Sequence, residues 1–91
     1  MNTIKIGDVR TFPNAAVNKE QALKVLEEAA EVYSAWENLS NDIDDAEYML
    51  AVECADLITA TSNLLYGLGI TDAGIFIEHV RKKNEVRGRY E

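Results

Sequence analysis

One stretch of this chain, Leu50–Leu68 (LAVECADLITATSNLLYGL), is apolar over most of its length and has only two charged side chains, Glu53 and Asp56. Such a stretch without proline is expected to form a helix that is buried on most sides. An unpartnered ionised carboxylate is costly there, and no Lys or Arg occurs between residues 25 and 80. Protonation, pairing with basic residues from the chain ends, or a bound metal ion would each relieve this cost. Because carboxylates three positions apart repel each other, we favour a cation.

The N-terminal part of the chain predicts an extended arm followed by a helix. Phe12-Pro13 disfavours helix within residues 1–17, which we therefore expect to be the arm. Asn18 and Gln21 have the spacing of a capping box, and the helix should run from about Lys19 to Glu37.

The apolar stretch should form the second helix. Asp44 and Glu47 repeat the capping pattern, so this helix is expected to begin at Asp44 and run to about Tyr66. Gly67 and Gly69 then provide a stop.

A third helix should begin at Thr71 or Asp72, as its cap, and end before Gly88. Three helices without a confident strand predict an all-α fold. We expect a single domain over residues 1–91, with the helical core in residues 18–91.

The first helix is amphipathic on a wheel of about 100° per residue. Its acids Glu27, Glu28 and Glu31 lie opposite the apolar sector and should form an exposed charged face. The apolar sector, which we expect to be the core side, consists of Leu23, Leu26, Ala29, Ala30, Tyr33 and Trp36.

The size of the chain favours assembly. A domain of 91 residues has a thin core, since a chain of this size buries only about 60% of its unfolded surface. The first and third helices can cover only two sides of the apolar helix. We therefore expect a homodimer or homotetramer in which hairpins from two chains form a four-helix-bundle core.

The distribution of charge restricts the class of partner. The net charge is −7, and residues 25–80 contain twelve acidic residues, whereas residues 81–91 are basic. This pattern argues against binding to a nucleic acid polymer and fits a small anion bridged by a cation. The sequence also lacks the apolar run of a signal peptide or membrane span. A single cysteine, Cys54, is expected to be a buried thiol in a cytoplasmic protein.

Two pairs of carboxylates are the strongest candidates for a functional site. The pairs Glu28-x-x-Glu31 and Glu53-x-x-Asp56 each lie on one face of a helix. In an antiparallel hairpin they can converge, and an all-carboxylate set favours Mg²⁺ or Mn²⁺. A di-iron bundle would require Glu-x-x-His motifs, and the only histidine, His79, directly follows Glu78.

Three segments in this order, LEEAAEVYSAW, VECADLITATSNLL and VRKKNEVRGRY, resemble the MazG-like all-α nucleoside triphosphate pyrophosphohydrolases. The resemblance covers roughly residues 20–90. It implies hydrolysis of a (deoxy)nucleoside triphosphate to the monophosphate and pyrophosphate by a homo-oligomer with Mg²⁺.

The resemblance also implies roles for individual residues. Glu28, Glu31, Glu53 and Asp56 would bind Mg²⁺. The residues expected to meet the nucleotide are Lys83, Asn84 and, more weakly, Arg87.

Two further roles follow from the chemistry of this site. Glu31 or Glu27 would accept a proton from the attacking water. Trp36 or Tyr33 would stack on the base, although packing in the helical core is the interpretation we favour for both aromatic residues.

Two other functions fit parts of the sequence. The main alternative is a non-catalytic helical interaction or regulatory module that oligomerises through its apolar helix. The second is a di-metal oxidoreductase, which would contain iron after purification.

Overall fold

A computed structural model describes residues 2–41 and 45–91. The chain order is α1 (Lys19–Glu37), a short 3₁₀ turn η1 (Asn38–Asn41), α2 (Ala46–Gly67) and α3 (Gly74–Val86). Within the described residues there is no β-strand, so the all-α prediction is confirmed. None of the helices in these ranges has the length and apolarity needed to cross a bilayer.

The start of α1 follows the predicted cap, but the capping box is incomplete. Asn18 Oδ1 accepts a hydrogen bond from the Gln21 backbone N–H at 2.8 Å. The Gln21 side chain does not return to Asn18; its amide donates instead to the Ala60 carbonyl of α2 at 3.0 Å. One half of the predicted box thus joins the two long helices.

The boundaries of α2 differ slightly from the prediction. The expected cap, Asp44, lies outside the described residues, and Asp45 occupies the N-cap position with φ 63°. Gly67 belongs to the helix, and Gly69 (φ 85°) ends it. The Gly69 N–H donates to Tyr66 O and the Ile70 N–H donates to Leu65 O, which satisfies two terminal carbonyls.

Helix α3 begins at Gly74, two residues later than a Thr71 cap and one residue later than an Asp72 cap would place it. Ala73 holds the N-cap position, so Thr71 and Asp72 were wrong as N-caps. Asp72 still contributes, because its Oδ1 accepts from the Gly74 N–H at 2.8 Å. Gly88, with φ 70°, follows the end of α3 as predicted.

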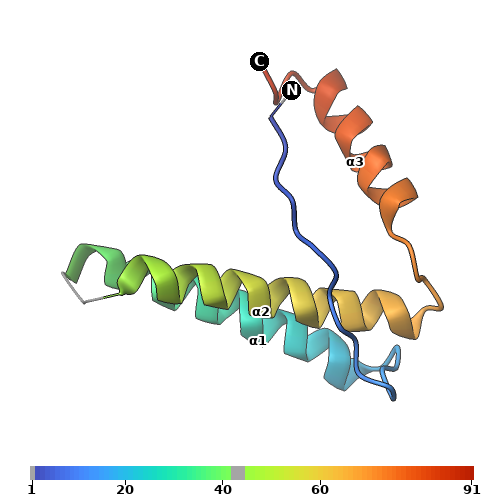
Figure 1. The fold of residues 1–91 in the computed structure, drawn as a ribbon, viewed down its shortest axis with the longest axis horizontal. Coiled ribbons are helices and arrows are strands. Elements are labelled where there is room, and N and C mark those ends of the chain that lie inside the picture. The colour runs from blue at the N-terminus through green and yellow to red at the C-terminus, as the bar shows by residue number, and fades with distance from the viewer. Residues whose placement is uncertain (1, 42–44) are drawn as a thin grey trace.

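Helices α1 and α2 form an antiparallel hairpin (Figure 1). The side of α1 that faces away from solvent is centred on Val25, Glu28, Val32 and Ala35. The predicted core sector is therefore wrong for a single chain, since Tyr33 and Trp36 are 60% and 57% exposed. Small side chains, Ala35 and Ala60, supply the buried apolar positions.

The N-terminal arm is fixed to α2 at two points. Asn63, only 1% exposed, accepts a hydrogen bond through Oδ1 from the Phe12 N–H at 2.7 Å. A Cβ on Gly67 would lie 2.8 Å from the Ala16 carbonyl carbon, so this close approach requires glycine. From there the arm runs towards the C-terminal end of α3 (Figure 1).

Helix α3 stands apart from the hairpin (Figure 1). Within the described residues, no Cα of α3 lies within 8 Å of a Cα in α1 or α2. The accessible surface is 7571 Å², whereas a compact monomer of 10.2 kDa would expose about 5,300 Å². In one chain, therefore, α2 is covered on one side only, and Cys54 is exposed rather than buried as expected.

Candidate metal centre

The hairpin brings together carboxylates that are distant in sequence. Oxygen atoms of Glu28 on α1 and of Glu53 and Asp56 on α2 all lie within 4.8 Å of one another. The antiparallel arrangement of the two helices produces this convergence (Figure 1). These three residues, with Glu31, are called the carboxylate cluster below.

Burial within the cluster is the reverse of what the sequence suggested. Glu28 was expected on an exposed charged face, but its side chain is only 9% exposed. Glu53 is half-buried and Asp56 is exposed, although both lie on the more apolar helix. The reason is that α2 packs over the Glu28 side of α1 and leaves much of its own circumference uncovered.

Glu31 lies at the exposed rim of the cluster. The negative charge of Glu28 raises the pKa of Glu31 above the usual value, and partial desolvation and the neighbouring Glu53 carboxylate add to the shift. The raised pKa indicates that the Glu31 carboxylate lies close enough to Glu28 and Glu53 to be affected by their charges. Glu31 is therefore coupled to Glu28 on its own helix and to Glu53 across the hairpin.

Lys24 supplies a counter-charge that the sequence interpretation missed. Its Nζ lies 3.0 Å from Glu28 Oε1 and 3.9 Å from Glu27 Oε2. The hydrogen bond to Glu28 raises the pKa of Lys24. The i, i+4 spacing of Lys24 and Glu28 was a signal that could have revealed this pair.

Two buried oxygens of the cluster still lack a partner. Glu28 Oε2 and Glu53 Oε2 have no hydrogen bond to any described residue. Buried carboxylate oxygens are normally satisfied, and leaving one unpaired costs about 1–3 kcal/mol or more. A cation coordinated by both oxygens would remove this cost. This set of oxygen donors fits a hard divalent ion.

The spacing of the cluster is compatible with Mg²⁺ or Mn²⁺. Oxygen ligands lie about 2.0–2.1 Å from Mg²⁺, so two opposite ligands are about 4.2 Å apart. The oxygens of the three carboxylates lie within 4.8 Å of one another, which is close to this separation. Asp56 and Glu31 are exposed, which leaves room for water or phosphate oxygens.

The other predicted residues of α1 lie outside the three-residue centre. Glu27 is exposed beside Lys24. Tyr33 and Trp36 stack on each other with ring centroids 5.8 Å apart and remain exposed. Both rings are therefore accessible for stacking on another group.

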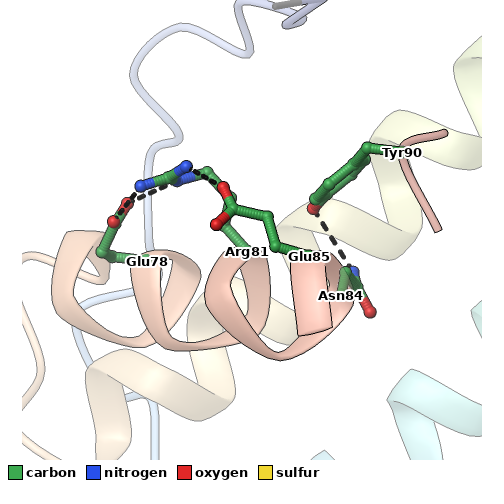
Figure 2. Close-up of polar contacts among 5 residues, drawn as sticks. All are labelled: Glu78, Arg81, Asn84, Glu85 and Tyr90. Carbon is green, nitrogen blue, oxygen red and sulfur yellow. Dashed lines mark hydrogen bonds and ion pairs between the residues drawn. The ribbon is translucent and has the colours of Figure 1, made fainter. Parts of the chain in front are cut away.

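The predicted nucleotide-binding residues Lys83, Asn84 and Arg87 are at the C-terminal end of α3. This end of α3 lies away from the α1–α2 hairpin that carries the carboxylate cluster (Figure 1). Asn84 Nδ2 donates to the Tyr90 hydroxyl at 3.4 Å (Figure 2).

Arg81 is engaged on another side of α3. Its Nε donates to Glu78 at 2.8 Å, and its other nitrogens pair with Glu78 and Glu85 (Figure 2). The hydrogen bond from Arg81 lowers the pKa of Glu78. The basic stretch is thus partly neutralised, while Lys82, Lys83 and Arg87 are exposed.

Comparisons with known proteins found no relative: no protein-family model, no curated protein sequence and no solved structure matches this chain.

Proposed function

We propose that this chain is an Mg²⁺-dependent nucleoside triphosphate pyrophosphohydrolase that converts a (deoxy)nucleoside triphosphate to the monophosphate and pyrophosphate. The proposal rests on one observation above all. Glu28, Glu53 and Asp56 converge across the hairpin, and two of their buried oxygens lack a hydrogen-bond partner among the described residues. The order of the MazG-like motifs connects this cluster with triphosphate chemistry.

In this proposal, Glu28, Glu31, Glu53 and Asp56 hold the cation. Mg²⁺ or Mn²⁺, when bound, neutralises phosphate charge and lowers the pKa of bound water. Buried Glu28 and half-buried Glu53 anchor the centre, whereas Asp56 and Glu31 face the side open to substrate. A residue at this open side can contact both solvent and phosphate.

Glu31 is the favoured proton acceptor, because its carboxylate is exposed at the open side of the cluster. A positioned carboxylate can accept a proton from water in the transition state. Glu31 would take a proton from the water that attacks phosphorus, as the bond to the departing pyrophosphate oxygen breaks. Glu27, exposed one turn before, is the second candidate.

Under this proposal the nucleotide-binding groups come from a second copy of the chain. Lys83 and Asn84 of α3 do not pack against the hairpin of their own chain, since no Cα of α3 lies within 8 Å of a Cα of α1 or α2 among the described residues. In a homodimer or homotetramer built on a four-helix core, the basic end of one α3 would approach the cluster of another subunit. The exposed rings of Tyr33 and Trp36 would then be available to stack on the base.

A non-catalytic oligomerisation module is the second candidate, and the exposed apolar surface favours it. The chain exposes about 2,300 Å² more total accessible surface than a compact monomer of its mass. Such a module would explain this surface but not the three converging carboxylates, two of which have unpartnered buried oxygens. For that reason we prefer the enzyme.

A screen of ribo- and deoxyribonucleoside triphosphates with detection of pyrophosphate tests the proposal. At least one nucleotide should be hydrolysed with Mg²⁺ or Mn²⁺, and EDTA should abolish the reaction. Asp56→Asn is a matched variant that removes one cluster charge with little change in volume, and it should strongly reduce turnover. An oligomeric, folded protein that releases no pyrophosphate from any nucleotide would instead support the interaction module.

A further inference from the structure

Lys24 is the one basic side chain that pairs with the carboxylate cluster within the described residues. It lies on α1 one turn before Glu28, and its Nζ is 3.0 Å from Glu28 Oε1. The two members of this pair differ in environment, because the Lys24 side chain is 53% exposed and the Glu28 side chain only 9%. The ammonium group can therefore move into solvent, whereas the carboxylate cannot.

The second oxygen of Glu28 points to a further ligand. Glu28 Oε2 is buried without a hydrogen bond to a described residue, and it belongs to the group that meets Glu53 and Asp56. Lys24 thus neutralises one side of a carboxylate whose other side remains unsatisfied. A single positive charge at the edge also leaves most of the cluster charge uncompensated.

We propose that Lys24 is the resident counter-ion of the cluster, a positioning residue that holds Glu28 and competes with a divalent cation for it. This inference rests on the proposed cation site. An ammonium and a divalent cation on the same carboxylate repel each other, so cation binding weakens the contact between Lys24 and Glu28. Lys24 thereby lowers the affinity for the cation while it stabilises the protein without one.

The proposal predicts two effects of opposite sign when Lys24 is removed. Without a divalent cation, the remaining carboxylates repel each other more, so the melting temperature should fall. The cation then has no competitor, so its affinity should rise. A side chain with a purely packing role would not lower stability and strengthen cation binding together.

Lys24→Gln is the test, with Lys24→Arg to retain the charge and Lys19→Gln as the matched loss of a lysine from the same helix. Mn²⁺ affinity is measured by titration calorimetry, and the melting temperature is measured in EDTA. Lys24→Gln should bind Mn²⁺ at least about threefold more tightly than wild type, which is within the range of one exposed ion pair. It should also melt below Lys19→Gln, whereas Lys24→Arg should resemble wild type.

Suppose that wild type binds Mn²⁺ clearly and that folded Lys24→Gln binds it equally or more weakly. This result would overturn the role of Lys24 and leave the cation site intact. An absence of Mn²⁺ binding in wild type and every variant would overturn both the site and this inference. If circular dichroism finds Lys24→Gln unfolded, Lys24→Met is used instead, because it retains the alkyl chain along α1. The same two opposite shifts are required of it.

Discussion

At the scale of single residues, Glu28 determines the electrostatics of the cluster. It is the most buried carboxylate of the four, and it contacts Lys24 on one side and the α2 carboxylates on the other. Its charge is the main reason for the raised pKa of Glu31. A change at Glu31 should therefore report the repulsion within the cluster without disturbing the buried packing.

We predict that Glu31→Gln stabilises the protein in EDTA at neutral pH. Folding raises the pKa of Glu31. Below the unfolded-state pKa the Glu31 carboxyl is protonated and its repulsion with the cluster is absent. This repulsion appears as the pH rises through the folded-state pKa. The melting temperature of the variant should exceed that of wild type at pH 7 and equal it near pH 4. Glu20→Gln, which removes a carboxylate of α1 outside the cluster, should not give this pattern. Equal melting of Glu31→Gln and wild type at pH 7 would contradict the coupling.

At the scale of elements, the contact between the arm and α2 depends on a helical glycine. Replacement of a helical glycine by alanine usually adds about 1 kcal/mol of helix stability. At Gly67 the new Cβ would lie 2.8 Å from the Ala16 backbone, so the arm must move. We predict a lower melting temperature for Gly67→Ala.

Hydrogen exchange at Phe12 provides the second measurement for Gly67→Ala. The Phe12 N–H is bound to buried Asn63, and displacement of the arm should accelerate its exchange. Exchange at helical amides far from the arm, such as Val32, serves as the internal control. A higher melting temperature with unchanged Phe12 exchange would show that the arm does not need glycine at this position.

The element boundaries were largely predictable because capping residues and glycines act locally. Asn18 caps α1, and Gly69 and Gly88 end the next two helices through positive φ angles. The packing face of α1 was not predictable from its apolar sector. The small residues Ala35 and Ala60 allow close packing at a different side, and hydrophobicity on a wheel does not specify which neighbour covers which sector.

The convergence of Glu28, Glu53 and Asp56 followed from helix spacing and hairpin topology, but their burial did not. Burial depends on where the two helices cross, and this is a tertiary property. Lys24 was not predicted to pair with the cluster, because counter-charges were expected from the chain ends. Its partner Glu28 lies one turn away on the same helix.

At the scale of the whole molecule, the exposed surface of the chain is large enough for a second copy to cover part of it. Obligate dimers bury roughly 2,000–5,000 Å² in total, which the excess surface of two chains can supply. An open groove of about 1020 Å³ lies between the arm, α2 and α3. Apolar side chains on its walls include Ile6, Val9, Leu57, Ile58, Leu65, Phe76, Ile77 and Val80.

We predict a dimer or tetramer by sedimentation at micromolar concentration. Leu26→Asp places a charge in the exposed apolar sector of α1 and should shift the protein towards monomer. Glu20→Asp, a conservative change near the start of α1, should leave the assembly unchanged. A wild-type protein that is monomeric and active would contradict both the packing argument and the shared site.

A mixing experiment tests whether subunits share a site. Glu53→Gln removes a cluster charge, and Lys83→Ala removes a basic group from α3. Each variant should have low activity alone, whereas co-refolded mixtures should recover activity because mixed oligomers contain some intact sites. Mixtures no more active than the separate variants would place both residues in one subunit's site or exclude Lys83 from it.

The most direct test of the central claim is the melting temperature of wild type and Glu53→Gln, each measured in EDTA and in excess Mn²⁺. Glutamine keeps the volume of Glu53 but removes the charge next to its buried, unpartnered oxygen. We predict that Mn²⁺ raises the melting temperature of wild type and that Glu53→Gln loses most of this rise, while the variant is at least as stable as wild type in EDTA. An equal rise in both proteins, or none in wild type, would contradict a divalent cation held by these carboxylates.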